Sequence, residues 1–128
     1  MKIAGSVILR YMRDASRFTR AAPELTPPIA VALHGDEILV GWYVNDEPFS
    51  GVAIVFTDEA MTFGTVATHH RLAYTDVLRS HFPRKESETT HLMVTTTSGP
   101  VEIVIAHSLR GRDAFCLGLA LWTLSGRR

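Results

Sequence analysis

The spacing of hydrophobic residues changes twice along this 128-residue chain. It follows a step of three or four through residues 2–22, a period of two through residues 29–107, and becomes almost continuous in residues 112–125. A step of three or four is typical of an amphipathic helix, and a period of two is typical of a half-buried strand. The chain therefore predicts one mainly β domain over residues 1–128, with a helix at each end of a strand region.

The N-terminal segment 2–22 predicts a helix with two separate stripes. Its apolar stripe consists of Ile3, Val7, Tyr11, Ala15, Phe18 and Ala22. Its basic stripe consists of Arg10, Arg13, Arg17 and Arg20. Residues at these spacings share one face of a helix, and the helix has to end before Pro23, because the residue ahead of a proline is pushed out of the helical region. The basic stripe is a candidate surface for binding a partner, with a merely solvated helix face as the alternative.

Turn residues divide the region 29–107 into short strands. Seven segments alternate apolar and polar residues: 29–33, 38–44, 52–56, 61–63, 72–74, 92–96 and 101–105. Gly35-Asp36 supplies a tight turn, and a polar loop is expected over residues 80–90. Trp42 and Tyr43 must face opposite sides of their strand, so one is expected in the core and the other on the surface. Short strands at this spacing indicate an antiparallel sandwich or barrel.

The C-terminal segment 112–125 predicts a second helix with hardly any charge. Asp113 suits its first turn, since a negative charge there meets the positive end of the helix dipole, and Gly126 suits its end. Because this helix is apolar on nearly every side, one face can cap the strands while the rest needs another cover. The N-terminal helix or a second copy of the chain would supply that cover, so a homodimer through this helix is one expectation.

Charge and cysteine content narrow the class of partner and the compartment. Thirteen basic and thirteen acidic side chains cancel, whereas proteins that bind nucleic acid usually carry a basic excess. The single cysteine cannot form an intrachain disulfide, which fits a reducing cytoplasm. Arg10 interrupts the N-terminal apolar run too early for a secretory signal, and no stretch approaches the ~20 apolar residues of a membrane span. We expect a cytoplasmic protein that binds neither nucleic acid nor a membrane.

Side chains suited to catalysis or metal binding are present but poorly arranged for either. Of six histidines, only His69 and His70 are close in sequence, and neighbours on a strand point to opposite faces. Cys116 falls in the most apolar helix, where burial disfavours the reactive thiolate. Asp58 and Glu59 occupy a turn, where carboxylates are ordinary. We therefore expect no catalytic residue, no metal and no cofactor, and a protein that is not an enzyme.

Segments 55–63 (VFTDEAMTF) and 70–77 (HRLAYTDV) are followed by Ser98-Gly99-Pro100 ahead of an aliphatic strand, and then by the helix at 112–125. In this order they resemble bacterial PH-like (pleckstrin-homology and GRAM-like) domains over residues 29–125. The resemblance implies a seven-stranded antiparallel PH-like barrel or sandwich with a C-terminal capping helix. The helix at 2–22 is then an addition to that fold.

The loop between the first two predicted strands departs from one subgroup of the resembled family. Members that bind phosphoinositides carry Lys and Arg in that loop, whereas here it is Gly35-Asp36 and has no cation. A phosphate site needs several donors that converge on one anion. Lipid head-group binding by that route is therefore disfavoured, and the resemblance implies a protein-binding scaffold.

The leading functional hypothesis is a non-enzymatic adaptor that binds a protein partner of acidic character through the basic stripe. Three alternatives stay open at this point. The first is an immunity-type inhibitor that neutralises a toxin, which the small single-domain size fits. The second is a small His-based hydrolase or metal enzyme, for which the chain has side chains in His69, His70 and Asp76. Binding of anionic lipid through the first helix is the third.

Overall fold

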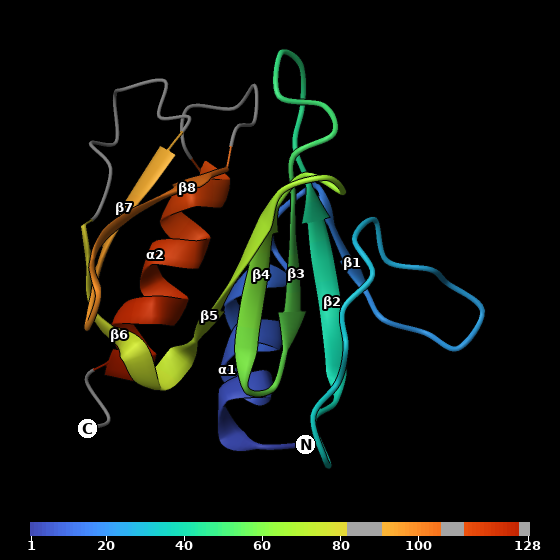
Figure 1. Ribbon diagram of the computed structural model, residues 1–128, viewed down its shortest axis with the longest axis horizontal. Coiled ribbons are helices and arrows are strands. Elements are labelled where there is room, and N and C mark those ends of the chain that lie inside the picture. Colours follow the sequence, from blue (N-terminus) through green and yellow to red (C-terminus); the bar gives the residue numbers. More distant parts are fainter. Residues whose placement is uncertain (82–90, 106–111, 126–128) are drawn as a thin grey trace.

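The computed structural model describes residues 1–81, 91–105 and 112–125. In these ranges the chain forms two α-helices, one 3-10 helix and eight strands (Figure 1). In chain order they are α1 (Ile3–Met12), β1 (Phe18–Arg20), β2 (Leu39–Val44), β3 (Ala53–Thr57), β4 (Ala60–Gly64), β5 (His69–Ala73), η1 (Tyr74–Asp76), β6 (Val77–His81), β7 (His91–Thr96), β8 (Gly99–Val104) and α2 (Arg112–Ser125). The prediction of a mainly β fold with a helix towards each end is confirmed.

The strands form two antiparallel sheets rather than one closed barrel. Five strands pair in the order β1-β2-β3-β4-β5, and three pair in the order β6-β7-β8. The 3-10 helix η1 carries the chain from one sheet to the other. Helix α1 packs against β2 and β3 of the first sheet, α2 packs against β6 and β7 of the second, and the two helices pack against each other (Figure 1). The expected cover of α2 by the N-terminal helix is thus confirmed.

The N-terminal helix ends ten residues earlier than the spacing predicts. It stops at Met12, and Phe18 to Arg20 then pair as strand β1 with β2. Ala15 and Phe18 contact the main core from the turn and the strand, as they would from a continued helix. The apolar spacing therefore could not discriminate between the two conformations, and pairing with β2 decided between them.

Two further strand assignments differ from the prediction. Residues 29–33 make no strand, although Ile29 is buried at one end of the segment and Leu33 is exposed at the other. Strand β6 was missed because Arg79, Ser80 and His81 make its sequence look polar, and because the polar Ser80 is buried beside Val77 while the apolar Leu78 is exposed. The remainder of the polar loop predicted for 80–90 lies outside the described residues, as does Gly126. A turn at Gly35-Asp36 is confirmed, with a φ of 56° at Gly35. The prediction that it joins two strands is wrong, because residues 29–33 ahead of it form no strand.

The first sheet is buried on both faces at β2 and β3, and Trp42 and Tyr43 contribute to different sides of it. Tyr43 belongs to the main core between the helices and the sheets, whereas Trp42 belongs to a second, smaller cluster with Ile29, Ala53 and Val55. Opposite orientation is confirmed. The expectation that one of the two rings lies on the surface is wrong, because residues 21–39 fold over the outer face and cover Trp42.

A buried carboxylate connects α2 to the first sheet. Asp113 lies in the first turn of α2, as predicted, and it is fully buried. Its Oδ2 accepts a hydrogen bond of 2.7 Å from the hydroxyl of Tyr43, and Oδ1 accepts one of 3.4 Å from the backbone N–H of Ser16. The same side chain therefore fixes the start of α2, the last part of β2 and the turn between α1 and β1.

We predict that Tyr43→Phe lowers the free energy of unfolding by about 1.5–3 kcal/mol at neutral pH, the usual range for a hydrogen bond to a charged group. Urea unfolding followed by circular dichroism measures this change. Burial, and then the neighbouring Asp113 carboxylate, raises the pKa of Tyr43. The folded state therefore holds this proton above pH ~10, the ordinary tyrosine pKa, while the unfolded state releases it. The stability advantage of the parent protein over Tyr43→Phe should thus shrink as the pH rises above that value. An advantage that stays constant would contradict this.

Candidate functional site

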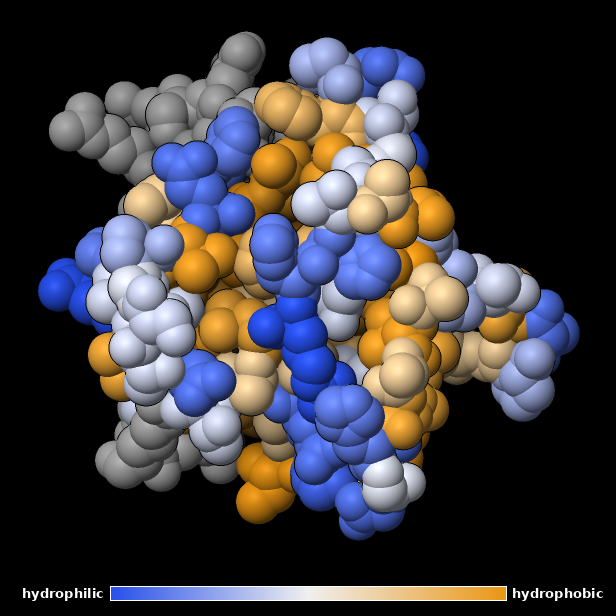
Figure 2. All heavy atoms as spheres, viewed as in Figure 1, coloured by the Kyte–Doolittle hydropathy of each residue, from blue (hydrophilic) through white to orange (hydrophobic). Residues whose placement is uncertain are grey.

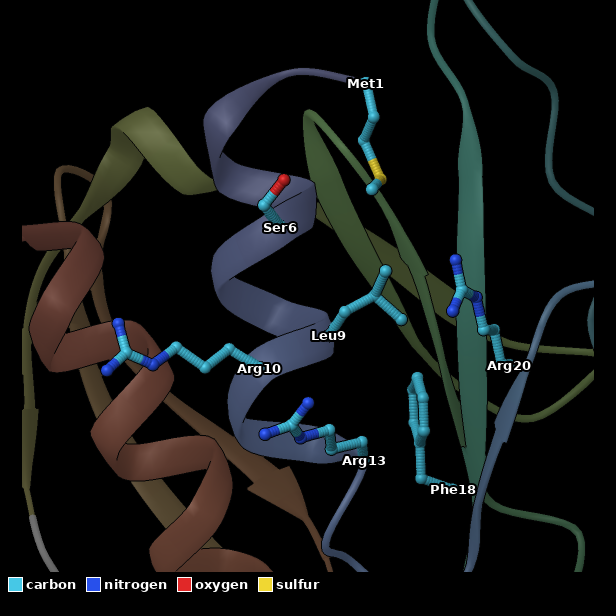
Figure 3. A pocket seen from close by; sticks show the side chains of 7 residues that line it. All are labelled: Met1, Ser6, Leu9, Arg10, Arg13, Phe18 and Arg20. Carbon is cyan, nitrogen blue, oxygen red and sulfur yellow. The ribbon is translucent and has the colours of Figure 1, made fainter.

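Three of the four arginines singled out in the sequence line one surface pocket. Arg10 lies on α1, Arg13 follows it, and Arg20 lies on β1; together with Met1, Ser6, Leu9 and Phe18 they enclose a volume of about 380 Å³. We call this the arginine pocket (Figure 3). Arg17 does not line it. The prediction that all four share one helix face is wrong, because the helix ends at Met12 and Arg20 reaches the pocket from a strand.

A tight reversal after α1 brings β1 back alongside the helix. The N–H of Ala15 donates to the carbonyl of Met12 at 2.9 Å, and the N–H of Phe18 donates to the carbonyl of Ala15 at 3.2 Å. Phe18 can then lie flat on β2 only because residue 41 is glycine. A Cβ at Gly41 would stand 2.5 Å from the Phe18 ring and 2.5 Å from the carbonyl oxygen of Thr19. Gly41 therefore allows the close approach that forms one wall of the pocket.

The arginine side chains are distributed around the pocket and do not converge. Figure 3 shows Arg10 extending towards α2 and Arg13 lying across the end of α1, while Arg20 stands on the strand on the other side. Leu9 and Phe18 lie between them and give the pocket an apolar floor (Figure 3). A single small anion would contact only part of this basic surface. The arrangement instead suits a ligand with several acidic groups and some apolar surface between them.

The charges of these arginines are not neutralised by any carboxylate in the described part of the chain. Among residues 1–81, 91–105 and 112–125, no carboxylate lies within ion-pair distance of Arg10, Arg13 or Arg20. Arg10 lies over the ring of Tyr11, with its guanidinium carbon 5.7 Å from the ring centre. A guanidinium group presents five donors in a planar fork that matches a carboxylate. The pocket therefore offers three such groups to an acidic ligand.

Arg17 has a structural role instead. Its Nε donates to the carbonyl of Val44 at 2.8 Å, and its terminal nitrogen forms an ion pair of 2.7 Å with Asp46. These contacts hold the chain entering β1 against the end of β2. The spacing of the sequence could not separate Arg17 from the other three, because its partners are about thirty residues away.

A second pocket, of about 450 Å³, lies between the two sheets and contains His70 and Asp76. Phe63, Thr96, Ser98 and Glu102 also line it. Figure 2 shows this side of the molecule, where hydrophilic residues form a strip over β4 and β5 with hydrophobic residues on both sides. His69 is not part of this pocket; its ring nitrogen lies 3.0 Å from the carbonyl oxygen of Thr65. The structure therefore brings together two of the three residues of the hydrolase hypothesis.

The inter-sheet pocket lacks the contacts that its chemistry would need. Within the described residues, no hydrogen bond joins His70 to Asp76, and His70 packs instead beside the ring of Phe63 at 6.2 Å between centres. Nor do three His, Cys, Asp or Glu side chains in those residues form a group that could hold a metal ion. Because a general base has to be oriented by a partner, this geometry gives the hydrolase hypothesis little support.

A third pocket, of about 670 Å³, lies at the start of α1 and is lined by charged groups that already have partners. Lys2 forms an ion pair of 3.0 Å with Asp36, and Arg71 forms one of 2.9 Å with the buried Glu37. Asp58 accepts the backbone N–H groups of Lys2 and Ile38, each at 2.9 Å. Burial raises the pKa of Asp58, but the backbone hydrogen bonds and the nearby charge of Lys2 together outweigh it, and the net shift is downward. Asp58 is therefore more than a turn residue: it anchors α1 to the first sheet.

The C-terminal helix carries one half-buried thiol and two exposed aromatic side chains. Burial raises the pKa of Cys116, which disfavours the thiolate and agrees with a packing role. Trp122 is 57% exposed and Phe115 is 37% exposed. With Leu119 they follow the spacing of one helix face. We call these three residues the α2 stripe.

No protein-family model matches the chain, and searches of curated proteins and of solved structures gave no match either. In the part of the chain that the structure describes, no helix has the length and hydrophobicity needed to cross a membrane.

The apolar floor is the part of the arginine pocket that sequence reasoning missed. Phe18 belongs to the predicted apolar stripe of the N-terminal helix, Leu9 lies outside that stripe, and Gly41 falls within the predicted strand 38–44 without a role of its own. A usable signal was present, since Phe18 stands between Arg17 and Arg20 in a segment with Thr19, and Phe and Thr favour strands over helices.

We predict that arginines inside and outside the pocket differ in their effect on stability. Arg17→Gln should lower the free energy of unfolding by about 1 kcal/mol, because it removes an ion pair and a charge-assisted hydrogen bond at a partly exposed site. The matched variant Arg13→Gln should leave that free energy unchanged within experimental error. Chemical denaturation of both variants measures the contrast, and equal losses would show that Arg13 also has a structural role.

Proposed function

We propose that the protein is a non-enzymatic binding module that docks an acidic surface of a partner protein in the arginine pocket. One observation carries the proposal: Arg10, Arg13 and Arg20 surround a pocket with an apolar floor, and no carboxylate of the described chain lies within ion-pair distance of them. Leaving three cations without local counter-charges costs little in water, and it makes binding energy available to an acidic partner.

A protein partner fits the pocket better than the other classes of ligand. A nucleic acid is disfavoured by the balanced overall charge, and a phosphate group is disfavoured because the guanidinium groups stand on opposite sides of the pocket (Figure 3). Carboxylates on a protein surface can be spaced to match several arginines, and apolar side chains between them can contact Leu9 and Phe18. Depletion of water over such a floor strengthens each ion pair.

The PH-like resemblance remains a proposal about the fold. Its support is that seven consecutive strands, β2 to β8, are followed by α2, with α1 and β1 added before them. A cytoplasmic location likewise stays a proposal, supported by the single free cysteine. Neither proposal is needed for the argument from the arginine pocket.

The binding proposal can be tested with a defined acidic peptide. We use a fluorescein-labelled seven-residue peptide, Thr-Glu-Val-Glu-Val-Glu-Thr, blocked at both ends, and measure fluorescence anisotropy at low ionic strength. Double reversal of Arg10 and Arg13 to Glu should weaken binding by about 10-fold or more, since each exposed charge contact contributes roughly 0.2–1 kcal/mol and reversal adds repulsion. Added salt should weaken binding to the parent protein.

The control for this experiment is Arg79→Glu, because Arg79 is an exposed residue of β6 on the other sheet. It tests the effect of net charge without touching the pocket, and it should change affinity much less than the double reversal. Equal weakening by Arg79→Glu, or no binding of the peptide to the parent protein, would contradict the proposed function.

We also propose that two copies associate through the α2 stripe. The support is the unusual exposure of Trp122 and Phe115 on an otherwise packed helix, since exposed aromatic clusters often mark interfaces. Light scattering should then give twice the chain mass of 14.2 kDa, and Trp122→Ser should return the mass to that of a single chain. A single-chain mass for the parent protein at high concentration would overturn this proposal.

A further inference from the structure

Strand β1 is the edge of the first sheet, and its hydrogen bonds show which of its backbone groups face outward. The N–H of Val44 donates to the carbonyl of Arg17, and the N–H of Ala21 donates to the carbonyl of Val40. Together with the antiparallel register of Thr19 opposite Trp42, these two bonds require Thr19 to exchange both of its hydrogen bonds with β2. Phe18 and Arg20 then direct their backbone groups away from β2.

Three of those outward groups have no backbone partner in the part of the chain that the structure describes. The N–H of Phe18 is occupied by the carbonyl of Ala15 at 3.2 Å. The carbonyl of Phe18 and both the N–H and the carbonyl of Arg20 remain. A row of such groups on an edge strand is a template for pairing with another extended chain.

The free edge and the arginine pocket belong to the same short strand. The side chains of Phe18 and Arg20 both line the pocket (Figure 3), while their backbone groups form the free edge. In an antiparallel pair, a residue directly opposite another places its side chain on the same face, with Cβ atoms about 5 Å apart. A residue that pairs with Arg20 would therefore present its side chain beside the Arg20 guanidinium.

We propose that an extended acidic segment of a partner protein binds by adding an antiparallel strand to β1, with its acidic side chains at every second position directed into the arginine pocket. The acidic character of the bound segment follows from charge complementarity, because the face that receives its alternate side chains carries Arg10, Arg13 and Arg20. This inference rests on the proposed function and adds the conformation of the ligand. The residue opposite Arg20 exchanges two hydrogen bonds with it, and the next acidic residue donates to the carbonyl of Phe18.

The pattern of backbone contacts separates strand addition from simple charge attraction. In the acidic peptide introduced above, the N–H groups of the three glutamates point to β1, and those of the residues between them point to solvent. A peptide N-methylated at its three glutamates should bind at least about 10-fold more weakly, since it loses two hydrogen bonds to carbonyl groups. A peptide N-methylated at the two valines and the last threonine should keep its affinity within about threefold, because it loses none.

Position 20 of the protein provides the complementary variant. Proline at an edge position removes an outward N–H without breaking the ladder to the neighbouring strand. Arg20→Ala removes only the side chain, so Arg20→Pro should bind the unmodified peptide about 3- to 10-fold more weakly than Arg20→Ala, by the hydrogen bond it additionally loses. Circular dichroism checks that both variants are folded, and the two methylated peptides test the unaltered protein whatever the outcome for Arg20→Pro.

Each result has a distinct meaning. Equal affinity for the two methylated peptides would overturn strand addition while leaving the arginine pocket as a binding site. Failure of the unmodified peptide to bind would overturn the proposed function and strand addition with it. If Arg20→Pro, but not Arg20→Ala, abolishes self-association in light scattering without peptide, the edge is occupied by a second copy of the chain and the inference is wrong.

Discussion

The buried carboxylate of Asp113 is the contact on which the arrangement of this molecule depends. It accepts a hydrogen bond from the Tyr43 hydroxyl on β2 of the first sheet and contacts Ser16 in the turn that follows α1. A buried charge is tolerated only where hydrogen bonds replace the water it has lost, so the start of α2 cannot move away from these donors. The reversal between α1 and β1 is fixed by the same contact, and the arginine pocket is a consequence of that reversal.

Much of the fold could be predicted from local patterns. Strands such as β3 and β7 alternate or are continuously apolar, and α2 was found with its correct limits because Asp113 and an apolar run define it. The errors occurred where a pattern fits two structures equally well. Phe18 packs against the core as part of a helix or of a strand, and Ile29 is buried whether or not its segment pairs with another. Pairing between distant segments decides such cases, and a single sequence does not show which segments pair.

The candidate site shows the same division between local and long-range information. The sequence identified the basic residues, because arginines recurring within one segment are a local feature. It could not show that Arg17 is held by Asp46 or that Gly41 lets Phe18 approach β2. These contacts join residues far apart in the chain. The result is a smaller site than the stripe suggested, with an apolar floor and a backbone edge that no helix could have offered.

Trp42 and Tyr43 stand next to each other yet belong to separate hydrophobic clusters. The two clusters therefore differ in the free energy needed to open them. The outer cluster is closed by residues 21–38, and from residue 22 to residue 33 that described segment makes no backbone hydrogen bond to the sheet. Its attachment rests on a few apolar contacts, so it can open locally at a lower free-energy cost than global unfolding. Opening would expose Trp42 while Tyr43 stays packed. In the Trp122→Ser variant, Trp42 is the only tryptophan of the chain, so a change in tryptophan emission would report that local unfolding specifically.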